Sequence, residues 1–139
     1  IIDSEAAGKR LGKRIVGLPG DTIYMRINTL VINGQPADYQ IVASDNESLI
    51  IRESLFDYSH EAMLSDGLTN RISRSFGPET VPDDQFFVLG DNRDNSADSR
   101  IYSFIPRDQI IGRSSSVVFS LDAERNYFPR ADRFLEDLE

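Results

Sequence analysis

The sequence predicts a fold built mainly from β-strands, and three observations support this prediction. Residues 22–27 (TIYMRI) consist mostly of strand-forming residues. Asn33-Gly34, a dipeptide that favours tight hairpin turns, follows the next apolar run. Residues 86–90 (FFVLG) form a short continuous apolar run, which is typical of a strand buried on both faces. We therefore expect a hairpin in the first third of the chain and a buried strand over residues 86–90.

The length and composition of the chain limit the classes of function that it can have. The 139 residues, 40% of them hydrophobic and 27% charged, suffice for one domain with a core that needs no disulfide or structural metal. A formal net charge of −8 and a pI of about 4.6 disfavour binding to nucleic acid. Because the chain has no cysteine, thiol nucleophiles and cysteine-rich zinc sites are excluded.

The first 80 residues divide into an end, a hairpin region and a less regular middle. Residues 1–12 (IIDSEAAGKRLG) carry small, polar and charged residues, and we interpret them as a linker or end. In residues 13–21 (KRIVGLPGD), Pro19 presets φ while Gly17 and Gly20 allow tight or left-handed geometry. Residues 38–80 contain short strand patterns (QIVAS, SLIIRES, RISRSF) and a loose helical spacing over residues 56–63. We interpret 38–80 as an inserted subdomain of mostly β character.

The last part of the chain places a polar loop after the buried strand. Residues 90–100 (GDNRDNSADSR) have one apolar side chain, and residues 114–120 (SSSVVFS) again have a strand pattern. We expect residues 13–37 and 81–122 to form the β core and residues 123–139 to form a C-terminal segment. A polar loop fed by a buried strand can present fixed side chains for chemistry.

A calcium loop is one alternative interpretation of the polar segment. Asp94, Ser96 and Asp98 have the spacing of the first ligands of an EF-hand. However, Ser99 and Ile105 stand where that motif requires glycine and glutamate, and neighbouring arginines add positive charge. We therefore predict no metal site.

Two further motifs are weak. His60, the single histidine, has no recognisable Ser-His-Asp motif around it, so we interpret it as a surface or partly buried side chain. The GLPGD turn is not followed by the GK[ST] sequence of a phosphate-binding loop. Neither motif predicts a cofactor.

Two longer segments are far more specific. KRIVGLPGD (13–21) and GDNRDNSADSR (90–100) resemble two signature boxes of type I signal peptidases, the membrane-anchored serine proteases that remove signal peptides from exported preproteins. Residues 110–120 (IIGRSSSVVFS) resemble the closing segment of that family. The resemblance is good over residues 13–26 and 83–122 and poor over 38–80. It implies an all-β peptidase core of twisted antiparallel sheets with an inserted smaller β-rich subdomain.

The resemblance implies a Ser/Lys dyad with Lys13 as the general base. A serine hydroxyl is a weak nucleophile until a base takes its proton. An ordinary lysine, with a pKa near 10.4, is almost fully protonated at pH 7, and burial can lower that pKa by several units. Lys13 lies two residues before the apolar pair Ile15-Val16, which suits such burial. Ser96 resembles the family serine whose hydroxyl orients the lysine amine.

The same resemblance assigns supporting roles to four charged residues. Asp98 and Arg100 resemble a charge pair that braces the loop, and we expect Asp91 to pair with Arg14 and so tie the two boxes together. Removing one partner of a partly buried pair leaves an uncompensated charge, so such pairs can hold geometry. The family chemistry implies no cofactor.

The nucleophile is expected to lie outside these residues. In the family it belongs to a Ser-Met-x-Pro-Thr box upstream of the lysine, whereas Met25 and Met63 are not preceded by serine. No apolar run is long enough to cross a bilayer. We therefore expect a partial catalytic domain that is inactive alone, from a parent held by an N-terminal anchor in the bacterial cytoplasmic membrane, with its catalytic domain on the periplasmic side.

Signal peptides of secreted preproteins are the expected partners, bound in extended form along an exposed strand. Two alternatives stay open at this point. A noncatalytic homologue would keep the fold as a binding or assembly module. A Ser/Lys self-cleaving repressor would share the dyad, but the GDNRDNSADSR box and the absence of a helix-turn-helix pattern disfavour it.

Overall fold

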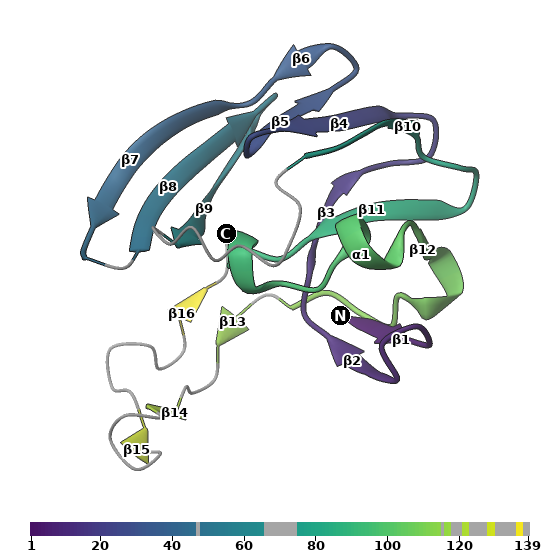
Figure 1. The fold of residues 1–139 in the computed structure, drawn as a ribbon. Coiled ribbons are helices and arrows are strands. Elements are labelled where there is room, and N and C mark those ends of the chain that lie inside the picture. Colours follow the sequence, from purple (N-terminus) through teal and green to yellow (C-terminus); the bar gives the residue numbers. More distant parts are fainter. Residues whose placement is uncertain are drawn as a thin grey trace.

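The chain is mostly β-structure, and its strands form several small antiparallel sheets (Figure 1). The computed structural model describes residues 1–46, 48–65 and 75–114, and beyond these the backbone of four two-residue strands: β13 (Ser116–Val117), β14 (Leu121–Asp122), β15 (Phe128–Pro129) and β16 (Glu136–Asp137). Every pairing between the described strands is antiparallel. The all-β prediction is confirmed.

The predicted hairpin lies in a four-stranded sheet. Its order is β10-β4-β5-β6, formed by β10 (Phe76–Thr80), β4 (Thr22–Arg26), β5 (Thr29–Ile32) and β6 (Gln35–Pro36). Asn33 and Gly34 connect β5 to β6 with φ values of 52° and 81°. Two positive φ values are what a type I′ hairpin turn requires, which explains the Asn-Gly pair. The hairpin prediction is confirmed.

The second core sheet contains the predicted buried strand. β11 (Gln85–Leu89) lies between β12 (Ile105–Pro106) and β3 (Arg14–Gly17). Phe87 and Val88 point to opposite faces of β11, and their exposed fractions are 0% and 1%. A Cβ on Gly17 would overlap the side chain of Ile23, so this glycine permits the close approach of β3 to β4. Strand β11 is therefore buried on both faces, as predicted.

The two sheets enclose one main apolar core and a smaller one. The main cluster consists of Ile23, Met25, Leu30, Ile32, Ala37, Val81, Phe87 and Leu89. The smaller cluster consists of Ile2, Phe86, Val88 and Ile105, on the other face of β11. Because β11 contributes to both clusters, its position is set by packing from two sides, and so is the loop that follows it.

Residues 38–65 form a sheet of their own. β7 (Asp38–Ser44), β8 (Ser48–Leu55) and β9 (Tyr58–Ser65) are consecutive antiparallel neighbours. The loose helical spacing noted over residues 56–63 does not become a helix, because pairing with β8 fixes this segment as β9. The predicted subdomain boundary at residue 80 is not a sheet boundary, since β10 pairs with β4. The predicted strand RISRSF lies mostly outside the described residues.

Residues 2–11 form a short hairpin of β1 (Ile2–Ser4) and β2 (Lys9–Leu11), although their composition predicts a linker. The difference arises from one apolar side chain, since Ile2 is 2% exposed and packs in the smaller cluster. Three one-turn helices complete the described chain: η1 (Arg93–Asn95), α1 (Ser99–Tyr102) and η2 (Arg107–Gln109). No helix among the described residues has the length and apolar character needed to cross a membrane. Of the predicted strand over 114–120, β13 is described.

Candidate active site

The polar loop 91–98 leaves β11 and folds back against it. Helix α1 begins after Asp98, whose carboxylate accepts a hydrogen bond from the Arg100 backbone N–H at 3.2 Å and so caps the helix. The Ser99 hydroxyl accepts a hydrogen bond from the Val88 backbone N–H at 2.9 Å. These two contacts attach the end of the loop to the strand from which it started.

Strand pairing brings Lys13 to this loop. Arg14 pairs with Leu89, so the residues just outside the paired segment, Lys13 and Gly90, come together. Lys13 Nζ lies 2.5 Å from Ser96 Oγ, across 83 positions of sequence. A Cβ on Gly90 would overlap the Ser96 hydroxymethyl group and lie 3.1 Å from Lys13 Nζ. Gly90 therefore leaves the space in which the lysine and the serine meet.

The surroundings of Lys13 favour its neutral amine. Burial is the largest effect and lowers the pKa of Lys13, and the positive charges of Arg100 and Lys9 lower it further. The carboxylates of Asp98 and Asp91 act in the opposite direction without reversing the shift. The net result is a lysine whose pKa is below its ordinary value, as a general base near neutral pH requires.

Asp98 and Arg100 form the buried ion pair of the site. Arg100 donates from Nε to Asp98 Oδ1 and from Nη2 to Oδ2, both at 2.8 Å, and the side chains are 0% (Asp98) and 1% (Arg100) exposed. Burial alone would raise the pKa of Asp98, but hydrogen bonds from Arg100 and from the Gly90 N–H lower it. The carboxylate is thus ionised, and it fixes the backbone of Gly90 beside the lysine.

Arg14 and Asp91 join the two sequence boxes at the surface. The guanidinium of Arg14 donates to both Asp91 oxygens, at 3.0 and 3.1 Å. Their side chains are 31% and 50% exposed, so this pair contributes little to stability. Its bidentate geometry nevertheless sets the distance between the start of β3 and the start of the loop.

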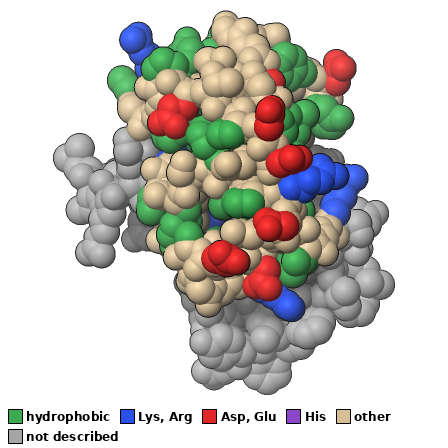
Figure 2. Space-filling view, turned by 90° about the vertical axis from the view of Figure 1, so that its right-hand side faces the viewer, with side chains coloured by type: hydrophobic (Ala, Val, Ile, Leu, Met, Phe, Trp, Pro, Cys, Tyr) green, Lys and Arg blue, Asp and Glu red, His purple; other side chains and the backbone are tan. Residues whose placement is uncertain are grey.

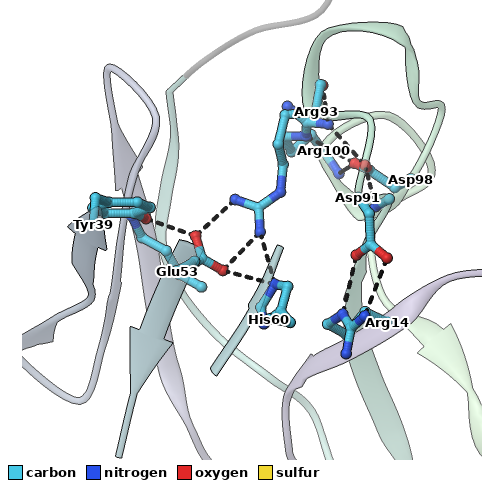
Figure 3. A network of polar contacts seen from close by, with 10 residues as sticks. Arg14, Tyr39, Glu53, His60, Asp91, Arg93, Asp98 and Arg100 are labelled. Carbon is cyan, nitrogen blue, oxygen red and sulfur yellow. Dashed lines mark hydrogen bonds and ion pairs between the residues drawn. The ribbon is translucent and has the colours of Figure 1, made fainter. Parts of the chain in front are cut away.

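Sequence analysis did not identify a buried polar network beside the loop. In Figure 3, Glu53 and His60 from the β7–β9 sheet contact the guanidinium of Arg93, and Tyr39 contacts Glu53 from its other side. One signal was present: in SLIIRES, Glu53 lies two residues after Ile51 and therefore on the same face of β8, which is the buried face. An acid on the apolar face of a strand predicts a buried partner.

The contacts of the loop and of His60 bear on two interpretations considered from the sequence, a calcium loop and a catalytic histidine. The three residues of the considered calcium loop have different partners: Ser96 contacts Lys13, Asp98 pairs with Arg100, and Asp94 accepts a hydrogen bond from the Ser65 N–H. The Arg100 guanidinium occupies both carboxylate oxygens of Asp98, which disfavours calcium at this loop. His60 is partly buried against Glu53, with its Nε2 atom 3.3 Å from Oε1.

The charge on the surface is mainly acidic. Figure 2 shows Asp and Glu side chains spread over the viewed face, whereas Lys and Arg side chains lie near its periphery, at the upper left, the right and the bottom. This distribution, with the net charge of −8, gives that face no broad basic surface for a phosphate backbone.

Comparison with known proteins places this chain in one family. The family model described as "Signal peptidase, peptidase S26" matches residues 1–119. A signal peptidase I of Bacillus amyloliquefaciens is 38% identical over 114 residues, which cover 81% of this chain and 53% of that protein. A signal peptidase I of Leptolyngbya laminosa is 37% identical over 102 residues, covering 73% of this chain and 37% of that protein.

A solved structure agrees in fold. The crystal structure of a signal peptidase I from Enterococcus faecalis V583 superposes with a TM-score of 0.51 at 32% identity, covering 82% of this chain and 90% of that chain. The chain spans between about a third and a half of the length of the curated relatives named above.

Proposed function

Because this chain belongs to the signal peptidase family S26, we propose that it is the part of a signal peptidase I that carries the general base of a Ser/Lys dyad. The observation that supports this most directly is the contact of Lys13 Nζ with Ser96 Oγ at 2.5 Å, beneath the buried Asp98–Arg100 pair. The proposed reaction is hydrolysis of the peptide bond between a signal peptide and its preprotein.

The role of Lys13 follows from its environment. In its neutral form, the amine accepts the proton of the nucleophilic serine as that oxygen bonds to the scissile carbonyl carbon. The resulting ammonium then gives the proton to the departing amine as the peptide bond breaks, which leaves an ester of the serine. Water then attacks this ester, the amine takes a proton from the water and returns it to the serine oxygen, and the new carboxyl group leaves. Ser96, which is 4% exposed, holds the amine in place and is not itself the nucleophile. Burial supplies the lowered pKa of Lys13 that this cycle needs.

Strand β3 is the proposed binding edge for the substrate. It pairs with β11 on one side, and in the described part of the chain no strand pairs with its other side. An extended peptide could add there through main-chain hydrogen bonds, immediately beside Lys13. The side chain of Ile15 in this strand is 42% exposed, which gives the edge an apolar contact for a small substrate side chain.

The serine nucleophile is proposed to lie outside these 139 residues, since no Ser-Met pair occurs in the sequence. The 139-residue chain alone is accordingly proposed to be inactive, and cleavage of a preprotein by the purified chain would contradict this. The parent is proposed to be held in the bacterial cytoplasmic membrane by an N-terminal anchor, with this domain on the extracytoplasmic side. Signal peptides of secreted preproteins are its proposed partners.

The proposal is tested in the full-length parent protein with two lysine variants. Lys13→Ala is expected to abolish preprotein cleavage, whereas Lys9→Ala, an exposed lysine four residues earlier, is expected to leave it nearly unchanged. Thermal unfolding shows that both variants are folded. Loss of cleavage in Lys9→Ala alone would contradict the assignment of the base. If the wild-type parent cleaves no preprotein, the noncatalytic binding or assembly module becomes the better interpretation.

A further inference from the structure

A buried ion pair joins the β7–β9 sheet to the polar loop. Arg93, in η1, donates from Nη1 to Glu53 Oε2 at 2.8 Å and from Nη2 to Oε1 at 2.7 Å. Both side chains are 1% exposed. Glu53 lies in β8, the central strand of its sheet, while Arg93 lies three residues before Ser96. The pair therefore links an element far from the dyad in sequence to the loop that carries Ser96 (Figure 3).

The carboxylate of Glu53 is held from other sides as well. The Tyr39 hydroxyl donates to Glu53 Oε2 at 2.7 Å and accepts the Leu30 N–H at 2.9 Å, which connects this carboxylate to the four-stranded sheet. His60 Nε2 lies 3.3 Å from Oε1. Burial by itself would raise the pKa of Glu53, but hydrogen bonds from His60 and Arg93 lower it to about 2. Glu53 is thus a fixed, ionised anchor for Arg93.

A chain of hydrogen bonds leads from Arg93 to the dyad. The Arg93 carbonyl accepts from Arg100 Nη2 at 2.6 Å, and Arg100 in turn holds Asp98. Asp98 Oδ2 accepts the Gly90 N–H at 3.0 Å, and Gly90 borders the space in which Lys13 meets Ser96. A shift of the Arg93 backbone would therefore displace the Arg100 guanidinium and, through it, the surroundings of the lysine.

Two other contacts hold the loop to β9 without Glu53. The Met63 N–H donates to the Asp91 carbonyl at 2.8 Å, and the Ser65 N–H donates to Asp94 Oδ2 at 2.8 Å. The loop should consequently stay attached when the charge of Glu53 is removed. The expected effect of such a change is a displacement of Arg93 and not the release of the whole loop.

We propose that Glu53 is a positioning residue that acts through Arg93 to set the geometry of the Lys13–Ser96 pair. By this proposal the β7–β9 sheet, which lies outside the two signature boxes, contributes to the active site. This proposal rests on the proposed function only where cleavage is measured. The protonation of the Lys13 amine can be measured without any cleavage.

The first measurement is the reactivity of the Lys13 amine as a function of pH. The full-length protein is labelled with limiting acetic anhydride at a series of pH values, and the peptide that contains Lys13 is quantified by mass spectrometry. Since a free amine reacts and an ammonium does not, the midpoint is the pKa of Lys13. Glu53→Gln should raise that midpoint by about one unit, because a displaced Arg93 also displaces the Arg100 guanidinium, whose positive charge lowers the pKa of Lys13.

The matched control is Glu61→Gln, a carboxylate on the neighbouring strand β9 that forms an exposed ion pair with Arg52 at 3.1 Å. This control should leave the midpoint unchanged. Glu53→Asp keeps the charge but shortens the reach to Arg93, so it should shift the midpoint in the same direction by less. Thermal unfolding shows whether each variant is folded. If Glu53→Gln does not fold, the shift of the Lys13 midpoint in Glu53→Asp tests the proposal instead.

The second measurement is cleavage of a preprotein by the same full-length variants. Glu53→Gln should lower kcat on the order of tenfold to a hundredfold, as small displacements of catalytic groups do, with little change in KM. Unchanged Lys13 midpoints in the folded Glu53 variants would overturn the proposal, whether or not the protein cleaves preproteins. If the wild-type protein does not cleave preproteins but Glu53→Gln shifts the Lys13 midpoint as expected, the proposed function is contradicted. The positioning role of Glu53 is then still supported.

Discussion

At the level of single residues, the site depends on a missing side chain as much as on those present. The backbone of Gly90 lies so close to Ser96 and Lys13 that any side chain would occupy the space in which their polar atoms meet. Its φ is not among the positive values, so the reason for glycine here is close packing and not backbone conformation. Glycine is therefore required at position 90 because of the contact between Lys13 and Ser96 in the folded chain.

A Gly90→Ala variant tests this requirement. We expect it to be destabilised by about 1–3 kcal/mol through overpacking, and to lose activity in the full-length protein because the dyad is displaced. Gly12→Ala is the matched control, since a Cβ there meets no atom within 4 Å. Urea unfolding and preprotein cleavage measure the two effects. Equal stability and activity of Gly90→Ala and Gly12→Ala would contradict the expected close approach.

At the level of elements, the position of the loop depends on a sheet that contributes no residue to the dyad. Glu53 of β8 neutralises Arg93 of η1, so the three-stranded sheet and the loop share a buried ion pair. Breaking such a pair leaves a buried charge without compensation, which is costly. The coupling of these two elements should therefore be visible in the pH dependence of stability.

The pKa of Glu53 gives the sign of that dependence. It falls from an ordinary 4.5 to about 2 in the folded chain, because hydrogen bonds from His60 and Arg93 outweigh burial. Its stabilising contribution, about 3 kcal/mol, is therefore complete above the unfolded pKa and is lost as pH falls from there through the folded pKa. In urea unfolding, Glu53→Gln should be less stable than wild type at pH 6, and the difference should narrow at pH 3. A difference that is the same at both pH values would contradict this.

Strand β1 is a second element whose importance lies in one contact. Ile2→Ala should lower the free energy of unfolding by about 2–5 kcal/mol, because it leaves a cavity in the smaller apolar cluster. Ile1→Ala is the control, since the side chain of Ile1 is 43% exposed and should contribute much less. Urea unfolding of both variants distinguishes a packed strand from a linker, for which the two substitutions would have similar small effects.

At the level of the whole molecule, the acidic charge limits which surfaces the domain can approach. A net charge of −8 opposes attraction to anionic phospholipids. We expect the 139-residue chain to remain in the supernatant when it is sedimented with phosphatidylserine-containing vesicles at low salt. Salt-sensitive binding to these vesicles, compared with vesicles of phosphatidylcholine alone, would show that a basic surface outweighs the net charge.

Much of the fold could be predicted because local signals agreed with the final packing. The Asn33-Gly34 turn and the apolar run of β11 each specify their structure within a few residues. The segment that became β9 had only a weak helical spacing, and pairing with β8 overrode it. The hairpin of β1 and β2 was not predicted, because the few apolar residues of this segment, among them Ile2 and Leu11, show no strand pattern and find their partners only in the folded chain.

The sequence by itself determined the family and the β character, and it predicted Lys13 and Ser96 as candidate site residues, because the two boxes are long and their residue types are specific. The tertiary structure alone decided that Lys13 meets Ser96 across 83 positions, that burial lowers the pKa of that lysine, and that Glu53 anchors Arg93. Burial and long-range contact depend on how strands pair and pack in space. No local pattern of residue types contains that information.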